Sequence, residues 1–268
     1  MVLRRRTFPG LLSEQPLDPS QSCMIEASHL AKRFGSIKAV DDFSFRIEPG
    51  EIVGLLGRNG AGKTTTLHML AGITRPDSGQ VRVCGVDLRE QPKRAKACLG
   101  FIADEPEFFE YLTVEEHLKF SGMLYGIQDG AATADRLISR FGLEEKRRAY
   151  PEELSRGMRQ KLALACVLHH DPKAILLDEP LTGLDPAGMR DMKDTILARA
   201  RDGAAILLSS HLLFLVEELC SRLLILNDGR LVASGTMQEI RGAAGDGTSR
   251  ELEAAFLDIT SRPAASAT

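Results

Sequence analysis

The stretch that decides the fold is GRNGAGKT, residues Gly57–Thr64. The apolar run Ile52–Leu56 precedes it, and a helical segment that starts near Lys63 and ends at Gly72 follows it. Its glycines let the backbone curl so that successive N–H groups point at one spot, to which a helix N-terminus adds the positive end of its dipole. A strand, a glycine-rich loop and a helix in this order predict a phosphate-binding loop.

The side chains of this loop indicate ATP as the ligand. We expect Lys63 to neutralise the β- and γ-phosphates and the Thr64 hydroxyl to ligate Mg²⁺. The alternative is a glycine-rich turn with an incidental lysine. The predicted nucleotide contacts of the loop are Gly57, Arg58, Asn59, Gly60, Ala61, Gly62, Lys63, Thr64 and Thr65.

Two carboxylates follow a second apolar run. Ala174–Leu177 leads directly into Asp178 and Glu179. Open α/β sheets bind their ligands at the carboxyl ends of strands, so this pair is expected beside the phosphate loop. Asp178 is predicted to hold Mg²⁺ through water, and Glu179 to act as the general base that takes a proton from the attacking water. A solvated acidic turn is the alternative.

The order of apolar patterns predicts the architecture. Residues 24–56 alternate apolar and polar side chains, which is typical of half-buried strands, whereas about 104–172 repeat apolar positions at helical spacing. Ala174–Leu177 and Ala205–Leu208 are continuous apolar runs, as buried parallel strands are. The 268 residues, 43% of them apolar, suffice for one large domain or two small ones.

Charge and cysteine usage exclude several classes of protein. Lys+Arg 34 against Asp+Glu 37 gives no basic footprint for nucleic acid, and the five cysteines form no CxxC pair, which favours reduced thiols over disulfides or zinc. No apolar run reaches the roughly 18 to 20 residues of a spanning helix.

The two ends of the chain are expected to lie outside the domain. We expect residues 1–23 to be a flexible extension, with Met24 as an alternative start. Residues 242–268 are expected to be a tail with one short helix, Arg250–Leu257.

A second helix start lies in the predicted helical insert. Leu154–Met158 reads LSRGM, with Ser155 at an N-cap position and Gly157 allowing close approach of the backbone. A capped helix N-terminus can bind an anion, but most serine-capped helices bind nothing. Taken alone, this motif predicts only where the helix begins.

Together these motifs resemble the nucleotide-binding subunit of ABC transporters, most closely bacterial export-type systems. The resemblance covers about residues 24–240 and rests on the order of GRNGAGKTT, LSRGM, AILLDE, GLDP (Gly183–Pro186) and His211 after a strand. It implies an α/β fold: a P-loop NTPase (RecA-like) core with an antiparallel β subdomain and an inserted α-helical subdomain. The domain is expected to span 24–241.

The resemblance also implies roles for single residues. Phe34 matches the aromatic that stacks on adenine, with a core phenylalanine as the alternative; Ser155 and Gly157 match the signature that contacts ATP on the other subunit. Asp185 matches the loop that links the two sites, and His211 the histidine that bonds the γ-phosphate. Asp104 occupies the place of a usual glutamine, where a carboxylate would ligand Mg²⁺ and repel phosphate.

The partners follow from the same resemblance. Two such domains would sandwich two ATP molecules and drive transmembrane permease subunits on separate chains, at the cytoplasmic face of the membrane. Phe108, Phe109 and Tyr111 either line the permease groove or pack the insert's own core. The alternative function is that of a soluble ABC ATPase without a transport role. A different kind of P-loop enzyme fits the sequence less well, because the helix that begins at the LSRGM motif would then have no explanation.

Overall fold

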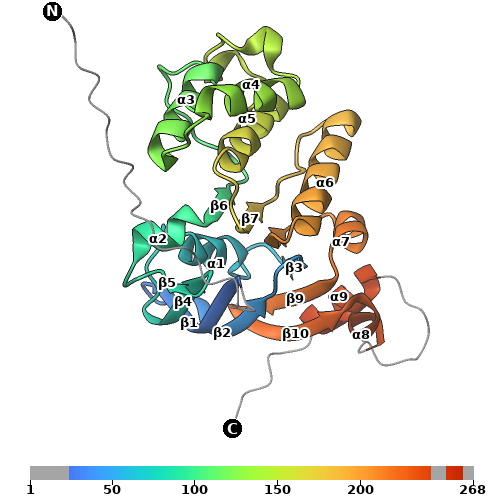
Figure 1. Ribbon diagram of the computed structural model, residues 1–268. Helices are drawn as coiled ribbons and strands as arrows, with labels where there is room; N and C mark the ends of the chain where they lie inside the picture. Colours follow the sequence, from blue (N-terminus) through green and yellow to red (C-terminus); the bar gives the residue numbers. More distant parts are fainter. Residues whose placement is uncertain (1–23, 243–251, 262–268) are drawn as a thin grey trace, which may run out of the picture. The chain divides into compact units, whose positions relative to one another are not determined.

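The computed structural model describes residues 24–242 and 252–261, which form two compact units. One unit is the helical segment Pro106–Asp171, and the other holds the remaining described residues (Figure 1). The predicted flexible extension over 1–23 lies outside the described residues, as does most of the predicted tail after 242.

The core of the larger unit is a sheet with strand order β10-β9-β3-β8-β7-β6. All neighbours are parallel except β10 and β9. Strands β3, β7 and β8 are buried nearly throughout, as their continuous apolar sequences predict. The strands are β3 (Ile52–Gly57), β6 (Leu99–Ile102), β7 (Ala174–Asp178), β8 (Ala205–Ser209), β9 (Arg222–Asn227) and β10 (Arg230–Thr236).

A second, antiparallel sheet has the order β2-β1-β4-β5. Its strands are β1 (Ile25–Phe34), β2 (Ile37–Ile47), β4 (Ser78–Val83) and β5 (Val86–Asp87). In β2, alternate side chains are buried, among them Phe43, Phe45 and Ile47. This alternation is what a sheet with one wet face requires.

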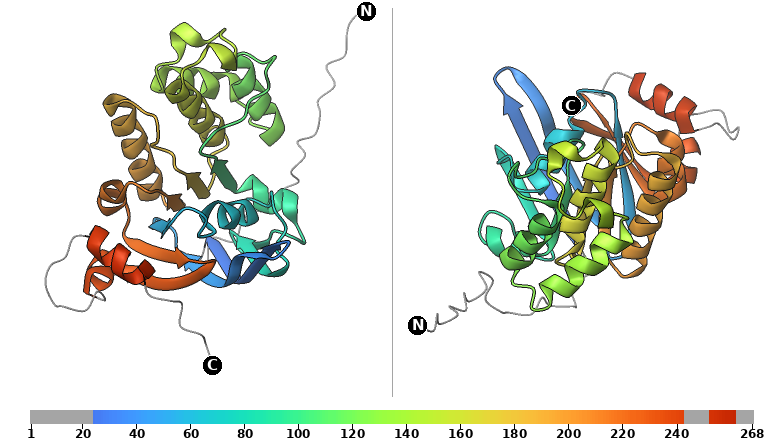
Figure 2. Two further views of the ribbon diagram at one scale, coloured as in Figure 1. Left: turned by 180° about the vertical axis from the view of Figure 1, so that it is seen from behind. Right: turned by 90° about the horizontal axis from the view of Figure 1, so that it is seen from above.

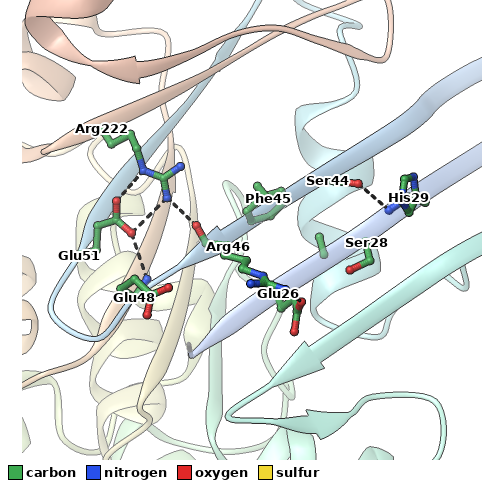
Figure 3. Close-up of a pocket in the computed structure, with 10 residues that line it drawn as sticks. Glu26, Ser28, His29, Ser44, Phe45, Arg46, Glu48, Glu51 and Arg222 are labelled. Carbon is green, nitrogen blue, oxygen red and sulfur yellow. Dashed lines mark hydrogen bonds and ion pairs between the residues drawn. The ribbon is translucent and has the colours of Figure 1, made fainter. Parts of the chain in front are cut away.

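An arginine joins the two sheets (Figure 3). Arg222 of β9 donates from Nε to Glu51 Oε1 at 2.6 Å and from Nη2 to the backbone carbonyl of Arg46 in β2. Glu51 Oε2 also accepts from the backbone N–H of Glu48. Both carboxylate oxygens of Glu51 are therefore used where the chain turns from β2 into β3.

Helices cover the larger unit's core sheet. They are α1 (Lys63–Leu70), α2 (Pro92–Ala97), α6 (Pro186–Arg201), α7 (Leu213–Leu219), α8 (Met237–Gly242) and α9 (Leu252–Ser261). The expected bounds of the last helix, Arg250–Leu257, were wrong at its end. Ala255 and Ile259 share the buried face of α9, which packs on β9 and β10, so the helix continues past Leu257.

The helical unit contains α3 (Val114–Tyr125), α4 (Gly130–Arg140) and α5 (Arg156–Leu168), with short 3₁₀ turns at Glu144–Lys146 and Pro151–Glu153. Figure 2 shows the three helices side by side. Thr113 and Glu116 form a reciprocal capping box at the start of α3. None of the described helices in either unit has the length and apolar character that crossing a bilayer demands.

The central strand β8 should carry much of the stability. Leu207, fully buried between β3 and β7, is expected to cost about 2–5 kcal/mol when replaced by alanine, because the sheet cannot collapse into the cavity. Urea unfolding would measure this loss. Leu257→Ala is the matched control: its side chain is 57% exposed, so about 0.5 kcal/mol or less is expected. Equal losses would contradict the buried position of Leu207.

Candidate functional site

A hollow of about 400 Å³ lies at the carboxyl ends of the core strands β3, β7 and β8. This is the edge at which open parallel sheets bind ligands. Ten of the residues predicted from the sequence line it: Asn59, Gly60, Gly62, Lys63, Thr64, Thr65, Asp104, Asp178, Glu179 and His211. Three residues that were not predicted complete the lining: Ile37, Ala39 and Thr182.

The loop between β3 and α1 requires its glycines. Gly62 has a φ of 105°, and a Cβ there would press into the carbonyl oxygen of Ala39, far inside van der Waals contact. Gly60 also has positive φ, 82°, but open space around it. The loop is closed by a bond from Ala61 N–H to the carbonyl of Arg58 at 3.0 Å. Close packing therefore fixes the backbone whose N–H groups would face a phosphate.

Lys63 brings a partly buried cation to this loop. Its Nζ donates to the carbonyl of Gly57 at 2.7 Å and to that of Arg58 at 3.3 Å. Burial lowers the pKa of Lys63, while the charges of Glu179 and Asp178 oppose that shift. The ammonium is thus held near two carboxylates at the end of β7.

Asp178 is positioned by a cross-strand partner. It lies at the end of β7, is 4% exposed, and accepts a hydrogen bond from the hydroxyl of Ser209, its register partner in β8. Ser209 was missed by the sequence analysis, although its place two residues before His211 was a usable signal. Asp178 and Thr64 offer carboxylate and hydroxyl oxygens in one hollow, the donor type that Mg²⁺ prefers.

Glu179 and His211 form a pair. The imidazole Nδ1 donates to Glu179 Oε2 at 2.9 Å, and the backbone N–H of His211 approaches the same oxygen at 3.3 Å. The side chain of Glu179 is 15% exposed and that of His211 56%. Glu179 also has a φ of 49°, a left-handed conformation that costs a non-glycine residue energy. Its N–H nevertheless bonds the carbonyl of Ser209 at 3.1 Å.

Other predicted residues lie away from this hollow. Phe34 is 52% exposed at the end of β1, with Lys32 Nζ 5.5 Å from its ring centroid, and it is not a core residue. Asp185 is the N-cap of α6 and accepts from Gly188 N–H at 2.7 Å. Gly57, Arg58 and Ala61 shape the loop without lining the hollow.

The signature motif belongs to the helical unit. Ser155 is the N-cap of α5, and its hydroxyl accepts from Met158 N–H at 3.2 Å. Gly157 lies in the first turn of the same helix. The N-cap expected from the sequence is therefore present.

A larger hollow of about 660 Å³ lies over the antiparallel sheet (Figure 3). Its charged groups bond one another: Arg222 pairs with Glu51, and Arg46 with Glu26. It has no glycine-rich loop among the residues drawn. The hollow beside Lys63 is accordingly the stronger candidate for a ligand site.

Comparisons with known proteins identify the family. A family model described as "ABC transporter" matches residues 40–182. The chain is 37% identical over 241 residues to the probable multidrug ABC transporter ATP-binding protein YbhF of Escherichia coli, covering 88% of this chain but 41% of that relative. The chain thus spans less than half the length of this relative.

In two further matches, a larger share of the matched protein is covered. The Nod factor export ATP-binding protein I of Burkholderia pseudomallei is 39% identical over 213 residues, which are 79% of this chain and 70% of that one. A solved structure of the ATP-binding subunit of an ABC transporter superposes with a TM-score of 0.82 at 33% identity, covering 88% of this chain and 99% of the other. The family and the fold class predicted from the sequence are confirmed.

The steric role of Gly62 can be tested. Gly62→Ala is expected to weaken ATP binding about tenfold or more, because the backbone must move away from Ala39 and lose its φ of 105°. Gly60→Ala is the matched control, since it meets the φ penalty alone. Titration with a fluorescent ATP analogue, alongside thermal melts, would compare the two. Equal weakening would show that the Ala39 contact is unimportant.

Proposed function

This chain belongs to the ABC transporter family of ATP-binding proteins, and we propose that it is the ATP-hydrolysing subunit of an export-type transporter. The observation that carries the proposal is the Glu179–His211 pair, which lies in the same hollow as Lys63 and the phosphate loop. A base, a cation and a nest of backbone N–H groups in one place are what hydrolysis of a phosphoanhydride needs.

The loop and Lys63 hold the β- and γ-phosphates. The carboxylates of Asp178 and Asp104 and the hydroxyl of Thr64 are the oxygens that would hold Mg²⁺, which when bound neutralises charge on the phosphates. Ser209 keeps Asp178 oriented by donating to its carboxylate. Asp104 places an additional negative charge in the hollow, where an amide would add none.

Glu179 takes a proton from water as that water attacks the γ-phosphorus. The hydrogen bond from His211 Nδ1 fixes the carboxylate in the hollow. The bond from Nδ1 to Glu179 leaves Nε2 as the ring nitrogen that would face the γ-phosphate. His211 in this way connects the base to the γ-phosphate that the water attacks.

The site is completed by a second subunit. Ser155 and Gly157 begin α5, whose first N–H groups and dipole suit a phosphate held by the partner's loop. Asp185 lies at the start of α6 and links the two sites in this arrangement. Phe34, half exposed at a strand end, stacks on adenine. A monomer then binds ATP but hydrolyses it poorly.

Permease subunits bind the helical unit. Phe109 is 58% exposed and Tyr111 86% exposed, which argues against the reading that they pack the insert's own core. The backbone N–H of Phe109 donates to His117 Nε2 at 3.1 Å, and its ring lies edge-on to Phe120. An apolar patch held in this way suits a helix of a membrane subunit at the cytoplasmic face of the membrane. We infer export as the direction of transport from the similarity to the Nod factor export protein.

The base can be tested with an isosteric change. Glu179→Gln should bind ATP with little change but hydrolyse it about 100-fold or more slowly, because the amide accepts no proton. Phosphate release and ATP binding would be measured side by side. Glu218→Gln, on an exposed carboxylate paired with Lys193, is the control and should hydrolyse normally. Turnover near normal in the Glu179 variant would remove it from the role.

Membrane association tests the permease surface. A Phe109→Ser, Tyr111→Ser double variant should lose most of its recovery in washed membranes while its ATPase fold and melting temperature persist, because both rings are exposed. Quantitative immunoblotting of membrane and soluble fractions would measure this. Phe214→Ser, in α7 and 60% exposed, is the matched control. Equal loss in the control would refute a specific surface.

A further inference from the structure

The end of strand β1 is tied to the chain just before β4. One carboxylate oxygen of Asp77 accepts from Lys32 Nζ at 2.9 Å, and the other accepts from the N–H of Arg33 at 2.8 Å. Lys32 Nζ also lies over the ring of Phe34, 5.5 Å from its centroid. We propose that Asp77 is a positioning residue, which acts through Lys32 to hold the Phe34 ring ready to stack on adenine. Only the assignment of adenine to Phe34 rests on the proposed function.

The turn that carries Asp77 lies close against β1. The N–H of Asp77 donates to the carbonyl of Ala31 at 2.9 Å. Gly79 has a φ of 91°, and a Cβ there would press into the carbonyl oxygens of Ser28 and His29. The backbone on both sides of the turn is therefore fixed to the strand. Asp77 in this way presents its carboxylate to β1 from a defined place.

The pairing of β1 with β4 stops before β1 ends. Ala31 and Ser78 are the last register pair between the two strands. Beyond that pair, the carboxylate of Asp77 serves as the acceptor for the N–H of Arg33. The hydrogen bonds from Lys32 and from this N–H lower the pKa of Asp77. The group is therefore an anion at neutral pH and keeps its attraction for the ammonium.

The ammonium of Lys32 lies between a carboxylate and an aromatic ring. The Lys32 side chain is only 16% exposed, although it carries a charge. A cation over the face of a ring is attracted by the negative charge of that face. The contact takes one face of the half-exposed Phe34 ring, so the opposite face is left for a base. Asp77 sets the place of the ammonium and, through it, the place of the ring.

The ring lies one strand away from the nucleotide hollow. Phe34 pairs with Ile37 across the β1–β2 hairpin, and Ile37 lines the hollow together with Lys63. A nucleotide whose phosphates lie on the loop can extend its base toward Phe34. Without Asp77, Lys32 is released and the ring gains conformational freedom, which adenine binding must then remove. The affinity for the base falls as a result, whereas the phosphate loop is unaffected.

Tryptophan fluorescence tests the proposal, because the sequence contains no tryptophan. In a Phe34→Trp chain, ATP should quench the single tryptophan by stacking, whereas inorganic tripolyphosphate, which has no base, should bind without quenching. Adding Asp77→Ala should raise the Kd of ATP about threefold or more. The Kd of tripolyphosphate, measured by calorimetry, should stay the same. Glu26→Ala is the matched control: it removes another paired carboxylate of the same sheet and should change neither Kd.

Two charge-removing variants show whether the effect passes through Lys32. Asp77→Asn keeps an oxygen for the N–H of Arg33 but loses the ion pair, and Lys32→Met loses the ammonium. Each should weaken ATP binding, and the two together should weaken it no further than Lys32→Met alone. A further loss in the double variant would overturn the route through Lys32.

The remaining outcomes separate this inference from the proposed function. Unchanged ATP affinity in Asp77→Ala, or equal weakening of ATP and tripolyphosphate binding, would refute the positioning role, since the latter result means a general loss of structure. ATP binding without quenching in the Phe34→Trp chain would refute the adenine contact and the inference with it. Absence of ATP hydrolysis by the unsubstituted chain would refute the proposed function, while the stacking measurements would still decide the role of Asp77.

Discussion

The site depends on the parallel register of β6, β7 and β8. Ile102 pairs with Leu177, Leu177 with Leu208, and Asp178 with Ser209, so the three strands end level with one another. The residues that follow them reach one hollow as a result. A slip of one position would turn Asp178 away from Ser209 and reverse the faces of a buried strand. The first four residues of β7 and of β8 are apolar and buried, which makes such a slip costly.

Much of this arrangement is predictable from the sequence because it is local. A loop is predicted by the glycines before Lys63, and a strand end by the carboxylates that follow an apolar run. Neither prediction requires knowing which strands lie beside these segments. Ser209 and Thr182 were not predicted, since their roles depend on register and on a turn. Thr182 N–H bonds the carbonyl of Glu179 at 3.2 Å and so helps shape the chain beyond β7. Which distant strands pair, and in which register, cannot be predicted from a single stretch of sequence.

Exposure is the other property that the sequence leaves open. Phe34 and Phe109 are large apolar residues for which a core position was a fair alternative, yet both are more than half exposed. Phe34 is at the last position of its strand, and the ring of Phe109 lies beside His117 and Phe120. In α9 burial was underestimated instead: Ile259 is buried, and the helix continues past the end that the sequence predicted. Burial is decided by the neighbouring element, which local periodicity does not identify.

Both ends of β7 are fixed by hydrogen bonds from outside the strand. At its start, Ala174 N–H bonds the carbonyl of Cys98, and just past its end Glu179 N–H bonds the carbonyl of Ser209. The second bond holds Glu179 in a left-handed conformation that costs about 1–2 kcal/mol. Glycine would relieve that strain but supply no carboxylate for His211. The strain persists because the packing of the buried sheet around β7 stabilises the fold by more than the strain costs.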